Sequence, residues 1–326
     1  MSELDYHVDI AKKYDQGLMG WMPYPGGMMA AAQGDETYVD AESLLKKWRN
    51  EPRVDTFAYR HVQSVYQTLG KKWETRYQRR GTCVGQAATE GALFLMAQRV
   101  YHGLDEWQGE PAVCGAYAGG RVNIAKQPGR WDGSNGNWSV KFFQQFGIVM
   151  RKHVGLSDDG ADAEQKDEQL AVQWAASRQG VPEDILAKAN PFRVKFWTYI
   201  EGEPEDVGLF VQRGFYAIHG SSYWCDGRLD RENFGVCTSH RGGHEQGWMG
   251  VRWTPNGELK GLLDRNSWSD SYYKSAPRYP DDQPGGTVWE TRDAVKSRIK
   301  RGEVIVFAGP DGFDRPALDY HIMTKK

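Results

Sequence analysis

The sequence has few cysteines for its 326 residues, namely Cys83, Cys114, Cys225 and Cys237. So small a number excludes a disulfide-rich scaffold. No two cysteines have the CxxC spacing of zinc and redox motifs, and His240 with His244 lacks an acid or thiol in matching register. Cys225 and Cys237 could pair, but four reduced thiols are the simpler interpretation. We expect no metal site and no cofactor.

An excess of charge of one sign and long apolar runs are also absent. The net charge is −2, which gives no general reason to expect a nucleic-acid partner. No run approaches the ~18 apolar residues of a membrane span, and the first residues lack the basic and apolar regions of a signal peptide. We therefore expect a cytoplasmic protein that binds neither nucleic acid nor membrane. One local basic cluster is interpreted as a solvated face: Lys71, Lys72, Arg76, Arg79 and Arg80.

Turn and alternation signals predict a β-hairpin in the last third of the chain. Two alternating apolar runs, residues 248–253 and 262–268, flank a Pro-Asn-Gly turn at 255–257. Folding the chain back about this turn brings His244 nearly opposite Asn266 at the open end of the hairpin. A histidine oriented by an amide and covered by a neighbouring indole is suited to act as a general base.

The segment around Cys83 predicts a nucleophile at the start of a helix. Gly81 and Thr82 form the turn, with Thr82 as N-cap, and apolar residues follow at helical spacing to about residue 101. Unpaired amides and the helix dipole favour a thiolate there, and a nearby imidazolium favours it further. Gln78 lies just upstream, where its side-chain amide could reach an oxyanion. A buried structural cysteine is the alternative, which the polar approach to this helix disfavours.

Two other histidines compete with His244 for the catalytic role. His240 lacks the Gly-Gly approach and lies four residues farther from the paired end of the hairpin. His219 lies on an apolar strand, where a hydrogen-bonded core histidine is the favoured interpretation. We therefore choose His244 as the base.

Together these residues resemble the papain-like cysteine peptidases: a Gln, then Gly-x-Cys opening a helix, a His on a strand, and Asn-Ser-Trp. The resemblance covers roughly residues 75–270. It implies an α+β, two-lobed fold, with a helical lobe that carries the Cys and an antiparallel β-sheet lobe that carries the His and Asn. It also implies cleavage of peptide bonds by acyl transfer. Cys83 would be the nucleophile, His244 the acid and base, Asn266 the orienting amide, and Gln78 an oxyanion donor.

A further match lies at residues 132–138, Asp-Gly-Ser-Asn-Gly-Asn-Trp, which resemble the glycine-rich segment of that family. The chain also departs from the family pattern. Val84 follows the nucleophile where an aromatic is usual, and Gln78 stands five rather than six positions before it. We expect substrate subsites unlike those of the lysosomal and plant enzymes. The resemblance implies these substrate-binding residues: Gly133, Ser134, Asn135, Gly136 and Trp268.

Composition divides the chain into an N-terminal arm (1–60), a helical lobe with the nucleophile (61–200) and a β-rich lobe with a C-terminal helix-strand extension (201–326). The arm is rich in Gly, Pro, Met and Trp, so its apolar residues need a surface to lie on. That surface is either the chain's own cleft or a neighbour. We favour a neighbour, a second copy or a virion protein, because no helical inhibitory prodomain is recognisable. Helices are predicted at 41–48, 83–101, 138–146, 161–178 and 287–300, and strands at 194–200, 215–220 and 304–308.

A thiol peptidase acting on peptide or protein substrates is the favoured function. One alternative is a cell-wall peptidase or amidase, although no repeat-type wall-binding module is seen. The other is a virion structural or interaction subunit that reuses the fold, which retention of Cys, His, Asn and Trp disfavours. The arm and the Gly- and Trp-rich helical lobe resemble bacterial and bacteriophage-encoded members, so the expected location is a host cytoplasm or a virion.

Overall fold

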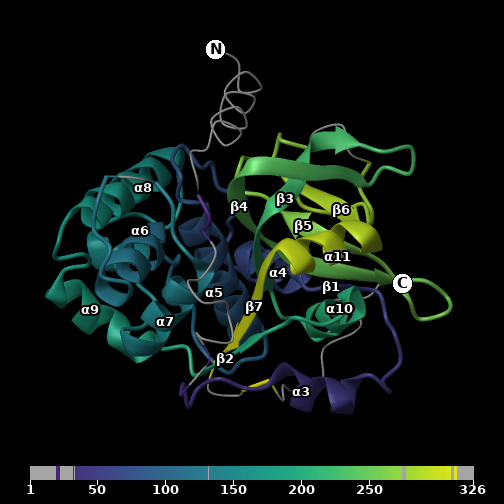
Figure 1. Ribbon diagram of the computed structural model, residues 1–326. Helices are drawn as coiled ribbons and strands as arrows, with labels where there is room; N and C mark the ends of the chain where they lie inside the picture. Colours follow the sequence, from purple (N-terminus) through teal and green to yellow (C-terminus); the bar gives the residue numbers. More distant parts are fainter. Residues whose placement is uncertain are drawn as a thin grey trace.

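A computed structural model describes residues 20–22, 32, 34–130, 132–273, 277–309 and 312–313. The helices between residues 113 and 189 gather on one side of the molecule, and the antiparallel sheet lies on the other together with the helices at 204–212 and 292–301 (Figure 1). The helical segments are α3 (Ala41–Trp48), α4 (Tyr59–Thr68), α5 (Cys83–Tyr101), α6 (Val113–Ala118), η1 (Gly119–Ile124), α7 (Gly136–Gln145), η2 (Arg151–Val154), α8 (Ala161–Ala176), α9 (Glu183–Ala189), η3 (Asn190–Phe192), α10 (Pro204–Gln212) and α11 (Arg292–Arg301). The strands are β1 (Thr56–Phe57), β2 (Phe196–Tyr199), β3 (Ala217–Leu229), β4 (Gly235–Trp253), β5 (Leu259–Arg265), β6 (Thr287–Thr291) and β7 (Gly302–Ala308).

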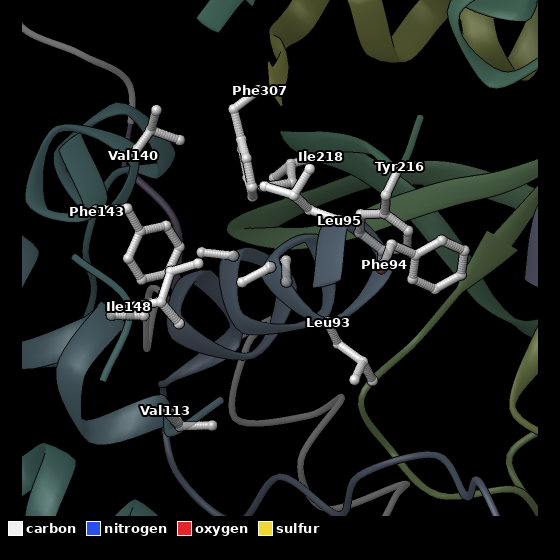
Figure 2. Close-up of a cluster of buried hydrophobic side chains, with 14 of the residues drawn as sticks. Leu93, Phe94, Leu95, Val113, Val140, Phe143, Ile148, Tyr216, Ile218 and Phe307 are labelled. Carbon is white, nitrogen blue, oxygen red and sulfur yellow. The ribbon is translucent and has the colours of Figure 1, made fainter. Parts of the chain in front are cut away.

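Helix α5 lies between the two halves and is buried along most of its length. Most of its side chains are small or apolar on every side, which is typical of a core helix. Figure 2 shows Phe143 and Ile148 of the helical half on one side of α5 and Ile218 and Phe307 of the sheet on the other. Gly91 permits this approach, because a Cβ there would come within 2.9 Å of the Phe307 ring. The α+β class expected from the sequence is confirmed.

The sheet has the strand order β2-β7-β3-β4-β5-β6, and β1 pairs with β4. All the pairings among the described strands are antiparallel. The predicted hairpin is confirmed as β4 and β5, in which Val251 faces Leu262 and Trp248 faces Asp264. None of the helices in the described ranges is long and apolar enough to cross a membrane.

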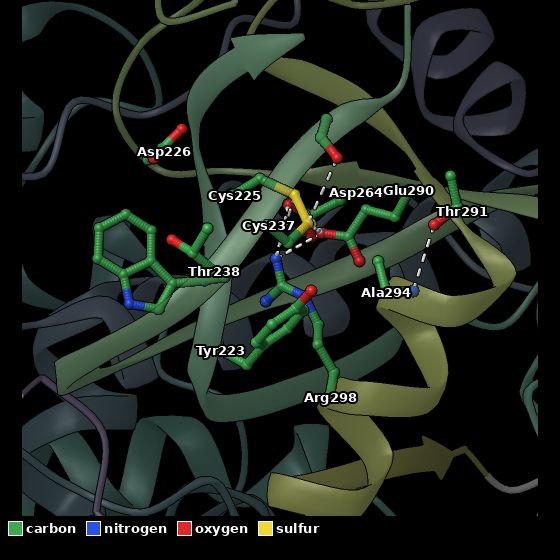
Figure 3. Close-up of a disulfide and its surroundings, with 12 residues drawn as sticks. Tyr223, Cys225, Asp226, Cys237, Thr238, Asp264, Glu290, Thr291, Ala294 and Arg298 are labelled. Carbon is green, nitrogen blue, oxygen red and sulfur yellow. Dashed lines mark hydrogen bonds and ion pairs between the residues drawn. A yellow bond between two sulfur atoms is a disulfide. The ribbon is translucent and has the colours of Figure 1, made fainter. Parts of the chain in front are cut away.

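Three sequence-based interpretations were wrong. Arg76, assigned to a solvated basic face, is buried and forms ion pairs with Glu90 and Glu110. Residues 287–291, predicted as the start of a helix, form strand β6, and the helix begins only at Arg292. Thr291 caps that helix by accepting a hydrogen bond from the Ala294 amide, so the local capping signal lay four residues inside the predicted helix. Cys225 and Cys237 are not free thiols but form a disulfide, since the β3–β4 register places them directly opposite each other (Figure 3).

A buried polar network fixes α11 to the sheet (Figure 3). The Arg298 guanidinium, which is 0% exposed, forms an ion pair with Glu290 and lies 3.9 Å from Asp264. It also donates to Nδ1 of His219, whose Nε2 lies 2.9 Å from Asp264. Burial, with the Arg298 charge beside it, lowers the pKa of His219 well below its usual value. His219 is therefore a neutral, hydrogen-bonded core histidine, as the sequence indicated.

Replacing Arg298 with Ala should destabilise the protein strongly, because Glu290 and Asp264 would remain buried without their cation. We expect the free energy of unfolding in urea to fall by about 3–5 kcal/mol. Lys300→Ala is the matched control, because Lys300 is exposed on the same helix. It should change the free energy of unfolding by less than about 0.5 kcal/mol. Equal effects of the two substitutions would show that the network contributes nothing.

Candidate active site

The candidate nucleophile is placed by the turn that precedes α5. Cys83 is the first residue of the helix, and Thr82 occupies the N-cap position without a side-chain capping bond. Instead, the Thr82 hydroxyl donates to Glu168 of α8 at 2.7 Å. The same carboxylate accepts the backbone N–H groups of Arg79 and Arg80, each at 2.9 Å. Glu168 thus holds the whole turn that presents the thiol, and sequence patterns alone gave no sign of this role.

Gln78 joins this turn to the Asn-Ser-Trp segment of the other half. Its backbone N–H donates to the carbonyl of Ser267 at 2.8 Å, and its side-chain oxygen accepts from the Ser267 hydroxyl at 2.6 Å. The side-chain NH₂ group donates to the carbonyl of Arg80. Gln78 therefore lies between the nucleophile turn and the residue that follows Asn266. The shorter Gln-to-Cys spacing does not separate it from the site.

The candidate base is held on two sides. Nε2 of His244 lies 3.1 Å from Oδ1 of Asn266. These are the two residues that the predicted hairpin brings close together. The indole of Trp268 stacks on the imidazole with a centroid separation of 4.4 Å and an interplanar angle of 14°. Trp224 approaches both rings edge-on. Because the carbonyl oxygen of Asn266 only accepts hydrogen bonds, Nε2 carries the hydrogen and Nδ1 is the basic nitrogen. His240 instead stacks on Trp224, outside this pair.

Residues 20–22 of the N-terminal arm lie across this site. The amide of Trp21 donates to the carbonyl of Gly243, the residue before His244, at 3.2 Å. On the other side, Ser134 donates to the carbonyl of Gly20 at 3.0 Å and accepts from the amide of Met22 at 2.8 Å. The Trp21 side chain lies in one buried cluster with Cys83 and Val84. Residues 20–22 of the arm therefore cover the candidate site of the chain itself; binding of a neighbour by the rest of the arm stays a prediction.

The glycine-rich segment provides the other wall of this cleft. Besides the Ser134 pairing, the Asn135 side chain donates to the carbonyl of Met22 at 2.8 Å. The Gly133 amide donates to the Tyr117 hydroxyl at 3.1 Å. The Gly136 amide donates to the carboxylate of Glu303 on β7 at 3.0 Å. Of the five predicted substrate-binding residues, Ser134 and Asn135 bond to the covering segment, and Gly136 and Gly133 bond to Glu303 and Tyr117 beside it. The fifth, Trp268, stacks on His244 instead.

The closed arrangement keeps both reacting groups neutral. Burial raises the pKa of the Cys83 thiol above its usual value, and the Glu245 carboxylate raises it further, while backbone amides of Glu245 and Val84 oppose the shift. Burial lowers the pKa of His244 to about 3, although the Asn266 bond acts in the opposite direction. The thiolate expected at a helix start is therefore not favoured here, because Cys83 and His244 are both 0% exposed.

Several site residues were missed by the sequence interpretation. Trp21 lies in a stretch without regular pattern, and Glu303 lies 282 positions from it although their side chains are hydrogen-bonded. Glu245 had a signal, because a buried acid directly after the candidate base is unusual on an apolar strand. In the part of the chain that the structure describes, one group has metal-like geometry, Cys225, Cys237 and Glu290. Its sulfurs are joined and its carboxylate is paired with Arg298, so it does not suit a metal.

No protein-family model matches the chain, and no curated protein matches it. Solved structures do match. Xylellain, a cysteine protease from Xylella fastidiosa, is 14% identical with a TM-score of 0.58, over 90% of this chain and 96% of that chain. The ragweed pollen cysteine protease Amb a 11, in its proform, is 10% identical with a TM-score of 0.52, over 93% of this chain and 76% of that chain. At these identities the likeness concerns the fold, which is that of the papain-like cysteine proteases.

Proposed function

We propose that this protein is a papain-like thiol peptidase that cleaves peptide bonds through Cys83, His244 and Asn266. The observation that carries the proposal is the fixed His244 ring, hydrogen-bonded to Asn266 and stacked on Trp268. The backbone of the next residue, Glu245, faces the thiol of Cys83 at the start of α5. A nucleophile beside an oriented base is the arrangement that acyl transfer requires.

The reaction follows from these groups. Nδ1 of His244 takes the proton of the Cys83 thiol, and the sulfur adds to the substrate carbonyl carbon. The oxyanion that forms is stabilised by the Cys83 backbone N–H and by the Gln78 amide. His244 then donates its proton to the leaving amine as the C–N bond breaks, which leaves a thioester. Water, deprotonated by the same imidazole, releases the acid and restores the thiol. Asn266 keeps the ring orientation throughout.

In the present arrangement this chemistry is blocked by residues 20–22. Trp21 excludes solvent from Cys83. Its neighbours Gly20 and Met22 form hydrogen bonds with the backbone of Ser134, which a bound peptide would use. The structure of the site therefore favours a closed form that opens when this segment leaves. The source in a bacteriophage or bacterium, and a location in a host cytoplasm or virion, rest on the sequence resemblance alone.

Trp21→Ala should open the site. Because the thiolate is the reactive form, lowering the raised pKa of Cys83 by exposure increases the thiolate fraction at pH 7. We expect iodoacetamide to label Cys83 at least about tenfold faster than in the unmodified chain, as read by mass spectrometry. In the unmodified chain, labelling should rise only toward strongly alkaline pH.

Trp107→Ala provides the control for a general loosening of the fold, since Trp107 packs on Tyr66, away from Cys83. It should leave the labelling rate of Cys83 unchanged. Cys114 is also buried, and its pKa is raised well above the usual value, so it should stay unlabelled in all three proteins. Equal acceleration by both tryptophan substitutions would contradict the closed form.

Turnover should depend on the three proposed catalytic residues. In full-length protein carrying Trp21→Ala, we expect Cys83→Ala and His244→Ala to abolish hydrolysis of a fluorogenic peptide library. Asn266→Ala should lower kcat by about tenfold or more with little change in KM, because it misorients the imidazole. Cys114→Ala is the matched cysteine control and should retain activity. A purely structural protein would show no turnover in the opened form, even though Cys83 is labelled.

A further inference from the structure

Two carboxylates flank a glycine on the face of the sheet that supports Trp21. In the strand register, Gly220 of β3 lies opposite Glu245 of β4 on one side and opposite Glu303 of β7 on the other. Residues paired directly across antiparallel strands point to the same face. The three positions therefore form a row, acid, glycine, acid, in which the missing side chain of Gly220 leaves a gap between the carboxylates.

The indole of Trp21 fills that gap. A Cβ on Gly220 would come within 2.2 Å of the indole ring, and a Cβ on Gly243 within 2.6 Å of it. The indole N–H donates to Glu303 at 2.6 Å. We call the space bounded by Gly220, Gly243, Glu245 and Glu303 the Trp21 slot. It is shaped for a flat side chain that carries a hydrogen-bond donor.

Glu303 accepts hydrogen bonds from the Gly136 amide and the Asn135 side chain as well as from Trp21, whereas Trp21 leaves Glu245 unsatisfied. Glu245 is 1% exposed, and within the described residues neither of its carboxylate oxygens has a hydrogen-bond partner. Both acids face the same space, because a Cβ on Gly136 would lie 2.7 Å from Glu245 Oε1 and 3.0 Å from Glu303 Oε1. Among the described residues, no lysine or arginine pairs with either acid. Burial raises the pKa of both, that of Glu303 to about 7.

We infer that the Trp21 slot is a specificity pocket for an arginine side chain of the peptide substrate, an inference that rests on the proposed peptidase function. The guanidinium is planar like the indole and fits over Gly220. Its five N–H donors face several directions, so it supplies bonds to Glu303 on one side and Glu245 on the other. Its fixed positive charge compensates the two buried acids, which the neutral indole does not. Trp21 thus occupies the place that arginine takes when the arm leaves.

The test uses full-length protein carrying Trp21→Ala and fluorogenic peptides. Arginine, citrulline, lysine and tryptophan are placed in turn at each of the three positions before the scissile bond. Citrulline matches arginine in shape and planarity but carries no charge. At one position we expect kcat/KM for arginine to exceed that for citrulline by about tenfold or more, with lysine between them.

Variants assign the preference to the slot. Glu303→Gln and Glu245→Gln should each lower the ratio of kcat/KM for the arginine peptide to kcat/KM for the citrulline peptide. Glu303→Asp keeps the charge and should retain most of that ratio. Glu183→Gln, at an exposed position on α9, is the matched control and should leave the ratio unchanged. If a slot variant fails to fold, the kcat/KM values for the arginine and citrulline peptides in the Trp21→Ala protein still test whether the pocket selects a positive charge.

Three outcomes would overturn the inference. Cleavage of arginine and citrulline peptides at equal rates would exclude a charge-selective pocket while leaving the peptidase function intact. A preference for tryptophan over arginine would show that the slot selects aromatic side chains. Labelling of Cys83 by iodoacetamide without cleavage of any peptide would refute the peptidase function itself, and the specificity pocket with it.

Discussion

The packing of α5 against the sheet is the constraint on which the rest of the structure depends. Gly91 brings the helix close to Phe307 and Ile218, and this contact sets where the first residue of the helix, Cys83, meets β4. The strand then delivers His244 and Glu245 to the same place. A bulkier residue at position 91 would move the helix away from the sheet, and Cys83 would separate from His244 and Glu245.

Rigid supports surround the reacting groups, and each acts from a different part of the fold. Glu168 on α8 ties down the turn before Cys83 through three donors. Trp268 stacks on His244, and Asn266 binds its Nε2. Under the proposed function, such supports lower the reorganisation needed during reaction, because the groups are already oriented.

Burial has opposite consequences in the two polar clusters of the molecule. In the Arg298 cluster, a guanidinium compensates Glu290 and Asp264, so the charges stabilise the docking of α11. In the Trp21 slot, the described residues supply no cation to either acid: Glu245 has no partner among them, and Glu303 accepts only from neutral donors. An uncompensated buried acid pair costs stability, and proteins tolerate such costs mainly where a ligand relieves them. The contrast is what separates a structural cluster from a binding one in this chain.

The sequence by itself determined the elements whose signals are local. The Pro-Asn-Gly turn and the alternation around it predicted the hairpin that brings the side chains of His244 and Asn266 together, and helical spacing placed Cys83 at a helix start. Only the tertiary structure decided that Trp21 covers the thiol and that Glu303 lies under the indole. The physical reason is that these contacts join residues far apart in the chain, 282 positions for Trp21 and Glu303, so no periodicity or turn chemistry encodes them. The same holds for the protonation of Cys83, since a helix start favours the thiolate locally but burial under Trp21 outweighs it.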